Sequence, residues 1–185
     1  MKPTKAQWAR IKLLATDVDG VLTDATVLYG PQGELAKPFF IRDGMGLRLL
    51  EGAGVRVAVV TSEDSALVSA RVKKLMLSAY RPGQKRKGEA MAALRAEFSV
   101  APEEIAYIGD DVNDLEAFAA VGIAVVPADG HSLLRQKAHF VSAFAGGRGC
   151  VREVADLILE AKGIDSGLLW ANLHPQSVAR DSGSV

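Results

Sequence analysis

Four short apolar runs, separated by helical patterns, constrain the fold more than any other feature of the chain. The runs are 11–15, 55–60, 105–108 and 123–126. They are rich in β-branched and aliphatic residues and show little alternation, which is typical of parallel strands buried on both faces. Helical patterns occupy 44–52, 64–76, 87–98, 112–120 and 150–161. Strands that alternate with helices predict an α/β fold built on a doubly wound parallel sheet.

One segment departs from this alternation. Residues 24–41 contain two short extended patterns, 26–29 and 37–41, around the turn sequence Gly30-Pro31-Gln32-Gly33. The arrangement predicts a β-hairpin directly after the first strand. We expect this hairpin to form a small flap, and no insert in the chain is large enough for a large cap domain.

Length and composition predict one domain over 1–162, followed by a tail over 163–185. A chain of 185 residues suits a single domain. The tail carries Gly, Ser and Asp with isolated apolar residues such as Leu168 and Trp170. Its composition is typical of a flexible extension.

Charge and cysteine content narrow the expected partners and location. The 22 basic and 22 acidic residues balance, so neither a nucleic acid nor a membrane surface is an expected partner. Cys150 is the single cysteine, which excludes a disulfide within the chain and fits a reducing compartment. No apolar stretch is long enough to span a bilayer. We therefore predict a soluble cytoplasmic protein.

Two carboxylates, Asp17 and Asp19, follow the first predicted strand. Alternate residues of an extended chain share a face, so both side chains can point the same way. A calcium loop of the EF-hand type that began at Asp17 would need glycine at its sixth position and glutamate at its twelfth. Leu22 and Leu28 stand there, which excludes that motif. An ordinary acidic turn remains the alternative.

Other reactive side chains also fall where predicted strands end, and ligands of open α/β sheets bind beyond those ends. Thr61-Ser62 follows the second strand, Gly109-Asp110-Asp111 follows the third, and Lys87 begins a helix between them. Each has a structural alternative: a helix cap for Thr61-Ser62, a solvated basic turn for Lys87 and a capping turn for Asp110-Asp111. Their occurrence together in one scaffold favours a single site.

The chemistry that needs this set is phosphoryl transfer through an aspartyl-phosphate. Asp17 would be the nucleophile, and Asp19 would protonate the leaving oxygen and later take a proton from water. Asp17 and Asp110 would hold Mg²⁺, which together with the Lys87 ammonium offsets the repulsion between carboxylate and phosphate. Thr61 would donate a hydrogen bond to a phosphate oxygen.

These motifs resemble the four motifs of the haloacid dehalogenase superfamily, over about residues 11–161. They read Asp17-Val18-Asp19-Gly20, Thr61, Lys87 and Gly109-Asp110-Asp111-Val112-Asn113-Asp114. The resemblance implies a Rossmann-like parallel sheet and Mg²⁺ bound by Asp17, the main-chain oxygen of Asp19 and Asp110. It also implies supporting roles for Gly20, Asp111 and Asp114.

A narrower resemblance is to the 3-deoxy-D-manno-octulosonate 8-phosphate phosphatases. It rests on Gly20-Val21-Leu22-Thr23-Asp24, Arg42-Asp43-Gly44-Met45-Gly46 and Gly146-Gly147-Arg148-Gly149-Cys150-Val151-Arg152-Glu153. The resemblance implies a phosphorylated sugar acid as substrate. It also implies a homotetramer without a large cap, in which the hairpin packs between subunits and a neighbour covers the active site. In that family the tail, here 163–185, can pack on a neighbouring subunit.

The residues that distinguish between possible substrates resemble two different groups of phosphatases. The octulosonate enzymes usually read Thr-Gly-Arg where this chain reads Thr61-Ser62-Glu63, and a glutamate there resembles the sister nonulosonate (sialic-acid-type) 9-phosphate phosphatases. Arg71 and Lys74 fall where that sister group carries basic residues, whereas Arg148 resembles the octulosonate group. Glu63 and Asp64 also have a structural alternative as acids in the first turn of a helix.

The resemblance therefore leaves a set of candidate substrate-binding residues and three functional alternatives. Asp43 is also expected to cap the helix at 44–52. Besides the nonulosonate phosphatase, the alternatives are a non-catalytic assembly domain of sugar-acid biosynthesis and a phosphomutase or phosphotransferase. The complete motif set argues against an assembly domain, and the missing cap argues against a transferase. The substrate-binding candidates are Arg42, Asp43, Ser62, Glu63, Arg71, Lys74 and Arg148.

Overall fold

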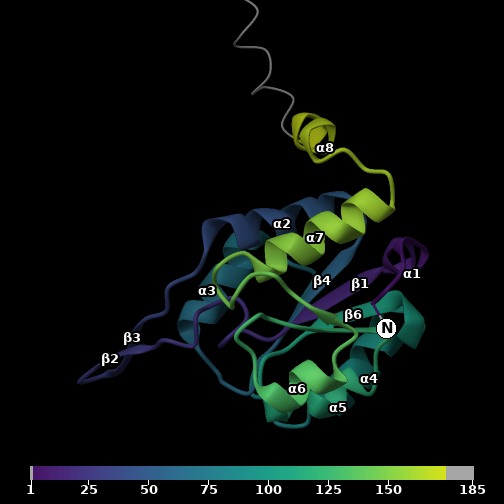
Figure 1. Cartoon of the computed structure of the whole chain (residues 1–185). Coiled ribbons are helices and arrows are strands. Elements are labelled where there is room, and N and C mark those ends of the chain that lie inside the picture. The colour runs from purple at the N-terminus through teal and green to yellow at the C-terminus, as the bar shows by residue number, and fades with distance from the viewer. Residues whose placement is uncertain (1, 174–185) are drawn as a thin grey trace, which may run out of the picture.

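A six-stranded parallel sheet runs through the middle of the computed structural model, which describes residues 2–173 (Figure 1). Its strand order is β5-β4-β1-β6-β7-β8. The predicted α/β fold with a doubly wound parallel sheet is confirmed. The strands are β1 (Leu13–Thr16), β4 (Arg56–Val60), β5 (Ala79–Arg81), β6 (Ile105–Ile108), β7 (Ile123–Val126) and β8 (Phe140–Val141).

Helices cover both faces of the sheet, and each face has its own apolar core (Figure 1). Leu14 of β1 faces the first core, and Leu13 and Ala15 face the second, as alternation in a strand requires. Within residues 2–173, no helix has the length and apolar character needed to cross a membrane. The first face carries α1 (Lys5–Arg10), α2 (Ile41–Gly52), α3 (Ala66–Leu75) and α7 (Cys150–Ala161), and the second carries α4 (Lys87–Phe98), α5 (Leu115–Phe118) and α6 (Ser132–Lys137).

The sheet is wider than the four strands predicted from apolar runs. The additional edge strands β5 and β8 have three and two residues, too few to form a recognisable apolar run. The predicted helix over 112–120 is also shorter, because the chain first makes a 3₁₀ turn at Val112–Asp114. That turn keeps several polar groups at the end of β6 instead of inside a helix.

The hairpin is present, but its second strand was predicted too late in the sequence. It pairs β2 (Leu28–Gly30) with β3 (Gly33–Ala36), and residues 37–40 lie outside any strand. Pro38 has no N–H group to donate to a strand partner, and Ile41 already begins α2. The hairpin projects from the body with exposed Leu28, Tyr29 and Leu35 (Figure 1).

Part of the predicted tail is a helix. Residues Ser166–Leu173 form α8, which packs on α2, so the prediction of a flexible extension is wrong for this stretch. Leu169 packs against the core of the first face, and Leu173 lies against Gly52. These two leucines are four residues apart, which places them on one face of the helix. The remaining tail, 174–185, lies outside the described residues, and its contact with a neighbouring subunit stays a prediction.

Candidate active site

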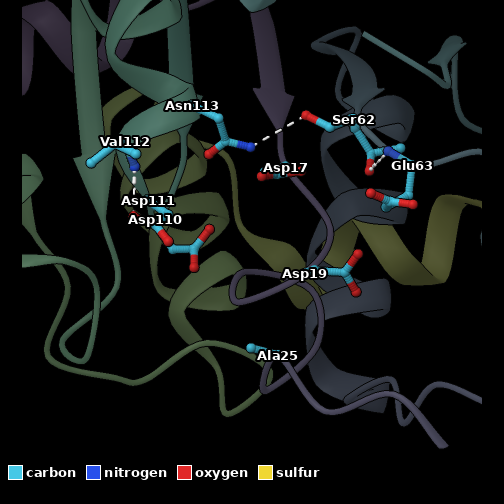
Figure 2. A pocket seen from close by; sticks show the side chains of 10 residues that line it. Asp17, Asp19, Ala25, Ser62, Glu63, Asp110, Asp111, Val112 and Asn113 are labelled. Atoms are coloured by element: carbon cyan, nitrogen blue, oxygen red, sulfur yellow. Dashed lines mark hydrogen bonds between the residues drawn. The ribbon is translucent and has the colours of Figure 1, made fainter. Parts of the chain in front are cut away.

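The loops that follow β1, β4 and β6 surround a pocket of about 450 Å³, here called the acidic pocket. Figure 2 shows Asp17 and Asp19 between the loop that carries Asp110 and the loop that carries Ser62. The strand ends that the sequence singled out therefore meet at one edge of the sheet. The pocket is lined by Asp17, Asp19, Ala25, Thr61, Ser62, Glu63, Asp110, Asp111, Val112 and Asn113.

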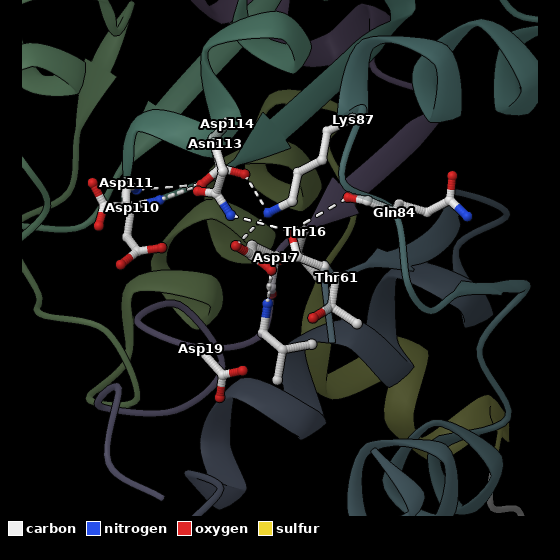
Figure 3. Close-up of polar contacts among 12 residues, drawn as sticks. Thr16, Asp17, Asp19, Thr61, Gln84, Lys87, Asp110, Asp111, Asn113 and Asp114 are labelled. Atoms are coloured by element: carbon white, nitrogen blue, oxygen red, sulfur yellow. Dashed lines mark hydrogen bonds and ion pairs between the residues drawn. The ribbon is translucent and has the colours of Figure 1, made fainter. Parts of the chain in front are cut away.

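A fully buried lysine lies under the floor of this pocket (Figure 3). Lys87, the first residue of α4, donates from Nζ to Asp17 Oδ2 at 2.5 Å and to Asp114 Oδ1 at 2.6 Å. Desolvation alone would lower the pKa of Lys87, but the charges of Asp17 and Asp114 outweigh it and raise this pKa. The lysine is therefore a fixed positive charge beside Asp17, and the alternative of a solvated basic turn is wrong.

Asp114 holds the loop after β6 in place. Its Oδ1 accepts from Lys87 Nζ and from the Tyr107 hydroxyl at 2.6 Å. Its Oδ2 accepts from the backbone N–H groups of Asp110 at 2.9 Å and Asp111 at 3.3 Å. Both oxygens thus carry two hydrogen bonds, as a buried carboxylate requires. The sequence placed Asp114 in a motif but indicated no role for Tyr107.

Three carboxylates converge closely enough to share a metal ion. One oxygen from each of Asp17, Asp110 and Asp114 lies within 4.8 Å of the others. Burial, and then repulsion from Asp114, raises the pKa of Asp17 to about 7. Burial, and then repulsion from Asp17, raises the pKa of Asp110 to about 7. Such mutual repulsion between oxygen donors suits a hard divalent cation. Each oxygen of Asp114 already accepts two hydrogen bonds, whereas each oxygen of Asp17 accepts one, so Asp17 and Asp110 are the better ligands.

Glycines allow the loop after β1 to lie close to the loop that carries Asp110 and to the segment around Gly146. Gly20 has a positive φ of 81°, and a Cβ atom there would lie 2.0 Å from Asp110 Oδ2. A Cβ on Gly146 would lie 1.9 Å from the carbonyl oxygen of Gly20. The N–H of Gly147 donates to Val21 O at 2.8 Å. The Gly146-Gly147 pair therefore packs directly against the loop that carries Asp19, Gly20 and Val21.

Asp19 has a partner that sequence reasoning missed. Lys37, between β3 and α2, donates from Nζ to both carboxylate oxygens of Asp19, at 2.9 and 2.8 Å. Desolvation would lower the pKa of Lys37, but its hydrogen bonds and charge interactions, first with Asp19 and then with Glu34, raise it. Lys37 lay in a segment interpreted as a strand, and no motif pointed to it.

The loop after β4 supplies the opposite side of the acidic pocket. Thr61 accepts at Oγ1 from the Glu63 N–H at 3.2 Å, and Asn113 donates to Ser62 Oγ at 3.3 Å across the pocket (Figure 2). The N-cap of α3 is Ser65. Thr61-Ser62 is therefore not the helix cap, and Glu63 precedes the helix instead of lying in its first turn. Both structural alternatives for this loop are wrong.

Two predicted substrate-binding residues line a second pocket. Arg42 and Arg148 border a depression of about 310 Å³ together with Phe40 and Phe144. Arg148 also donates to Asp24 at 3.0 Å. Neither arginine lines the acidic pocket of this chain.

The other three candidates also lie outside the lining of the acidic pocket. Asp43 is buried inside α2, and its Oδ1 accepts from the Arg152 N–H at 2.8 Å near the start of α7. The cap position of α2 is Phe40, so the prediction that Asp43 caps that helix is wrong. The Arg71 guanidinium lies 5.5 Å from the centre of the Phe39 ring, and Lys74 is exposed on α3. None of these three lines the acidic pocket.

Known proteins resemble this chain in both sequence and fold. Residues 34–122 match a model of haloacid dehalogenase-like hydrolases. A 3-deoxy-D-manno-octulosonate 8-phosphate phosphatase from Yersinia pestis is 45% identical over 154 residues, which cover 83% of this chain and 82% of that protein. The same phosphatase from Escherichia coli is 42% identical over 158 residues, 85% of this chain and 84% of that protein.

Solved structures agree with the sequence comparison. The Yersinia pestis phosphatase superposes with a TM-score of 0.84 at 43% identity, covering 86% of each chain. The Moraxella catarrhalis phosphatase, solved with a magnesium ion, a phosphate ion and a KDO molecule, has a TM-score of 0.85 at 34% identity and covers 92% of this chain and 97% of that one. The chain belongs to the haloacid dehalogenase-like hydrolases and, within them, to the family of the 3-deoxy-D-manno-octulosonate 8-phosphate phosphatases, which are phosphoric monoester hydrolases.

Proposed function

We propose that this protein is a Mg²⁺-dependent phosphatase that removes the terminal phosphate of 3-deoxy-D-manno-octulosonate 8-phosphate. The observation that carries the proposal is the arrangement of Asp17 between the Lys87 ammonium and the Asp110 carboxylate at the edge of the acidic pocket. It supplies a nucleophile, a fixed cation and oxygen donors for a metal within one cluster. Relatives that carry this activity in their names are 42–45% identical to the chain, which supports the same substrate.

In the first step, an oxygen of Asp17 attacks phosphorus, and the bond between phosphorus and the sugar oxygen breaks. Both Asp17 oxygens are oriented, because Oδ1 accepts from the Val18 N–H at 2.7 Å and Oδ2 accepts from Lys87. Asp19, which accepts from Lys37 as a carboxylate, takes up the proton of the entering phosphate monoanion and gives it to the leaving sugar oxygen. Lys87 offsets the charge of the entering phosphate, and Thr61 hydrogen-bonds one of its oxygens.

In the second step, water attacks the aspartyl-phosphate and gives its proton to Asp19. The bond between phosphorus and Asp17 breaks, which releases phosphate and restores the carboxylate. Asp17, Asp110 and the main-chain oxygen of Asp19 would hold Mg²⁺, which would supply charge neutralisation at the phosphate. We propose a supporting role for Gly20 and Asp111, which shape the loops around these ligands.

A second substrate class, the nonulosonate 9-phosphates, is favoured by one observation. Glu63 lines the acidic pocket with Ser62, where a substrate hydroxyl or amide group could reach it. Arg71 and Lys74 would then belong to the substrate contacts made across subunits.

The direct test measures phosphate release from octulosonate 8-phosphate and from nonulosonate 9-phosphate side by side, with Mg²⁺ and with a chelator. We expect Mg²⁺-dependent release with a higher kcat/KM for the octulosonate. Preference for the nonulosonate would make Glu63 a specificity residue. Absence of Mg²⁺-dependent release from both would contradict the proposal and favour an assembly role.

We further propose that the protein works in the cytoplasm as a homotetramer whose hairpins lie between subunits. The exposed side chains of Leu28, Tyr29 and Leu35 support a subunit contact at the hairpin. A neighbouring subunit placed there could bring a second copy of Arg42, Lys74 or Arg148 toward the acidic pocket. Light scattering after size-exclusion chromatography tests this assembly, and a monomeric mass would contradict it.

A further inference from the structure

We propose that Lys37 is a positioning residue that fixes the Asp19 carboxylate for proton transfer to the leaving group. The inference rests on the proposed phosphatase function, because it concerns how the acid of that reaction is held. It adds Lys37, which directly follows the hairpin, and Glu34 of the hairpin strand β3 to the groups that orient Asp19 within its own subunit.

The contact geometry carries the first part of the argument. Both oxygens of Asp19 accept from the same ammonium group, at 2.9 and 2.8 Å. The Lys37 side chain is 1% exposed, whereas that of Asp19 is 29% exposed and lines the acidic pocket. Lys37 therefore holds Asp19 from the protein side and leaves it accessible to a substrate.

The ammonium group is itself anchored by the hairpin. Glu34 of β3 lies with Oε1 at 3.2 Å from Lys37 Nζ, and its Oε2 accepts a short hydrogen bond from the hydroxyl of Ser65. Ser65 is the buried N-cap residue of α3, four positions after Thr61. A continuous chain of polar contacts thus links Asp19 through Lys37 and Glu34 to the helix that follows the Thr61 loop.

A purely structural ion pair is the alternative explanation. Buried pairs are often no more stabilising than apolar residues of similar size, so stability alone is weak reason for this arrangement. A structural pair also does not require that the carboxylate face the reaction pocket. The placement of Asp19 at the pocket surface, with its cation behind it, suits control of orientation.

Orientation of a general acid has a specific kinetic consequence. A sugar alkoxide is a poor leaving group and needs the proton from Asp19, whereas nitrophenolate leaves without one. A misplaced Asp19 should therefore slow the first step for sugar phosphates and leave it nearly unchanged for p-nitrophenyl phosphate. The ratio kcat/KM reports this step, because it includes events only up to the first irreversible one.

The experiment compares kcat/KM for octulosonate 8-phosphate and p-nitrophenyl phosphate in Lys37→Met and in the control Lys73→Met. Lys73 is exposed on α3. We expect Lys37→Met to lose roughly 10- to 100-fold on the sugar phosphate and less than about threefold on p-nitrophenyl phosphate. The loss on the sugar phosphate is part of the roughly 10²- to 10⁴-fold that general acid catalysis supplies. Lys73→Met should match the wild type on both substrates.

A double-mutant cycle separates positioning from a general structural effect. If Lys37 acts through Asp19, Lys37→Met should add less than about twofold to the loss already caused by Asp19→Asn. Glu34→Gln, which keeps both Lys37 and Asp19, should reproduce the leaving-group selectivity at smaller size and covers the case in which Lys37→Met does not fold.

Equal losses on both substrates, or additive losses in the cycle, would overturn the role of Lys37 and leave the phosphatase function intact. A wild-type protein without Mg²⁺-dependent activity on either substrate would instead overturn the proposed function itself.

Discussion

The buried floor of the acidic pocket and the exposed substrate-binding candidates outside that floor, here called the rim, are built differently. On the floor, Asp17, Lys87 and Asp114 are buried and interlocked by hydrogen bonds. In this outer region, Glu63 lines the acidic pocket and is exposed, Arg148 lines the second pocket and pairs with Asp24, and Lys74 is exposed on α3. Hydrogen bonds on both sides restrain the floor side chains, whereas the exposed rim side chains have fewer such restraints. We therefore expect substitutions in the two regions to change different quantities.

The largest expected effect is the loss of chemistry in Asp17→Asn. The amide is not a nucleophile toward phosphorus, so kcat should fall by more than about 10⁴-fold. Lys87 keeps its contact with Asp114, so the protein should stay folded. Phosphate release and circular dichroism check both points. Retained activity in this variant would contradict the role of Asp17 as the nucleophile, and the floor would then not differ from the rim in its effect on kcat.

Asp114→Asn tests whether the floor is held by its hydrogen bonds. The amide can offer only one acceptor oxygen, and its NH₂ group would face the N–H donors of Asp110 and Asp111 or the donors Lys87 and Tyr107. We expect a loss of about 2–4 kcal/mol in the free energy of unfolding, measured by denaturant titration. The matched rim variant Arg148→Ala should lose less than about 1 kcal/mol. Similar losses would show that the two regions do not differ in rigidity.

Without metal, the floor should make stability depend on pH. The pKa values of Asp17 and Asp110 are raised from 3.8 to about 7 in the folded protein, so between these pH values the unfolded chain binds fewer protons. Stability should therefore fall as pH rises from about 4 to about 7, by several kcal/mol, because each unit of pKa shift corresponds to about 1.4 kcal/mol.

Adding Mg²⁺ gives a second test of the pH dependence of stability. Because the metal binds ionised carboxylates, saturating Mg²⁺ should flatten the pH dependence and release protons on binding. Thermal unfolding with chelator and with Mg²⁺, together with calorimetry in two buffers, measures both effects. A pH profile that Mg²⁺ leaves unchanged would contradict the assignment of Asp17 and Asp110 as ligands.

The smallest effects are expected at the rim. Arg148→Ala and Lys74→Ala should raise KM by up to about tenfold and change kcat by less than about twofold, because these side chains do not contact the reacting atoms. Steady-state kinetics on octulosonate 8-phosphate measures the two constants separately. A large drop in kcat would place these residues, through a neighbouring subunit, in the reaction itself.

The sequence predicted the floor better than the rim for a physical reason. Asp17, Thr61 and Asp110 each follow a buried strand, and parallel strands bring such positions together whatever the loops do. Arg42 and Asp43 adjoin in the sequence, yet one is exposed in a second pocket and the other is buried against α7. Their orientation depends on helix packing, which no local pattern encodes.

The contacts of Lys37 and Tyr107 were missed for a related reason. Each residue is an ordinary member of its segment, and its importance comes from a partner brought close by the tertiary fold. The edge strands β5 and β8 and the helix α8 were likewise missed, because short elements are stabilised by what they pack on.

The central claim is that Asp17 carries the phosphoryl group between two half-reactions. In Asp19→Asn the second half-reaction should be slowed, so an acid quench during turnover of p-nitrophenyl phosphate should trap the intermediate. We predict one phosphoryl group on the peptide that contains Asp17, found by mass spectrometry and absent in Asp17→Asn with Asp19→Asn. A phosphoryl group on another residue, or none during active turnover, would contradict the account.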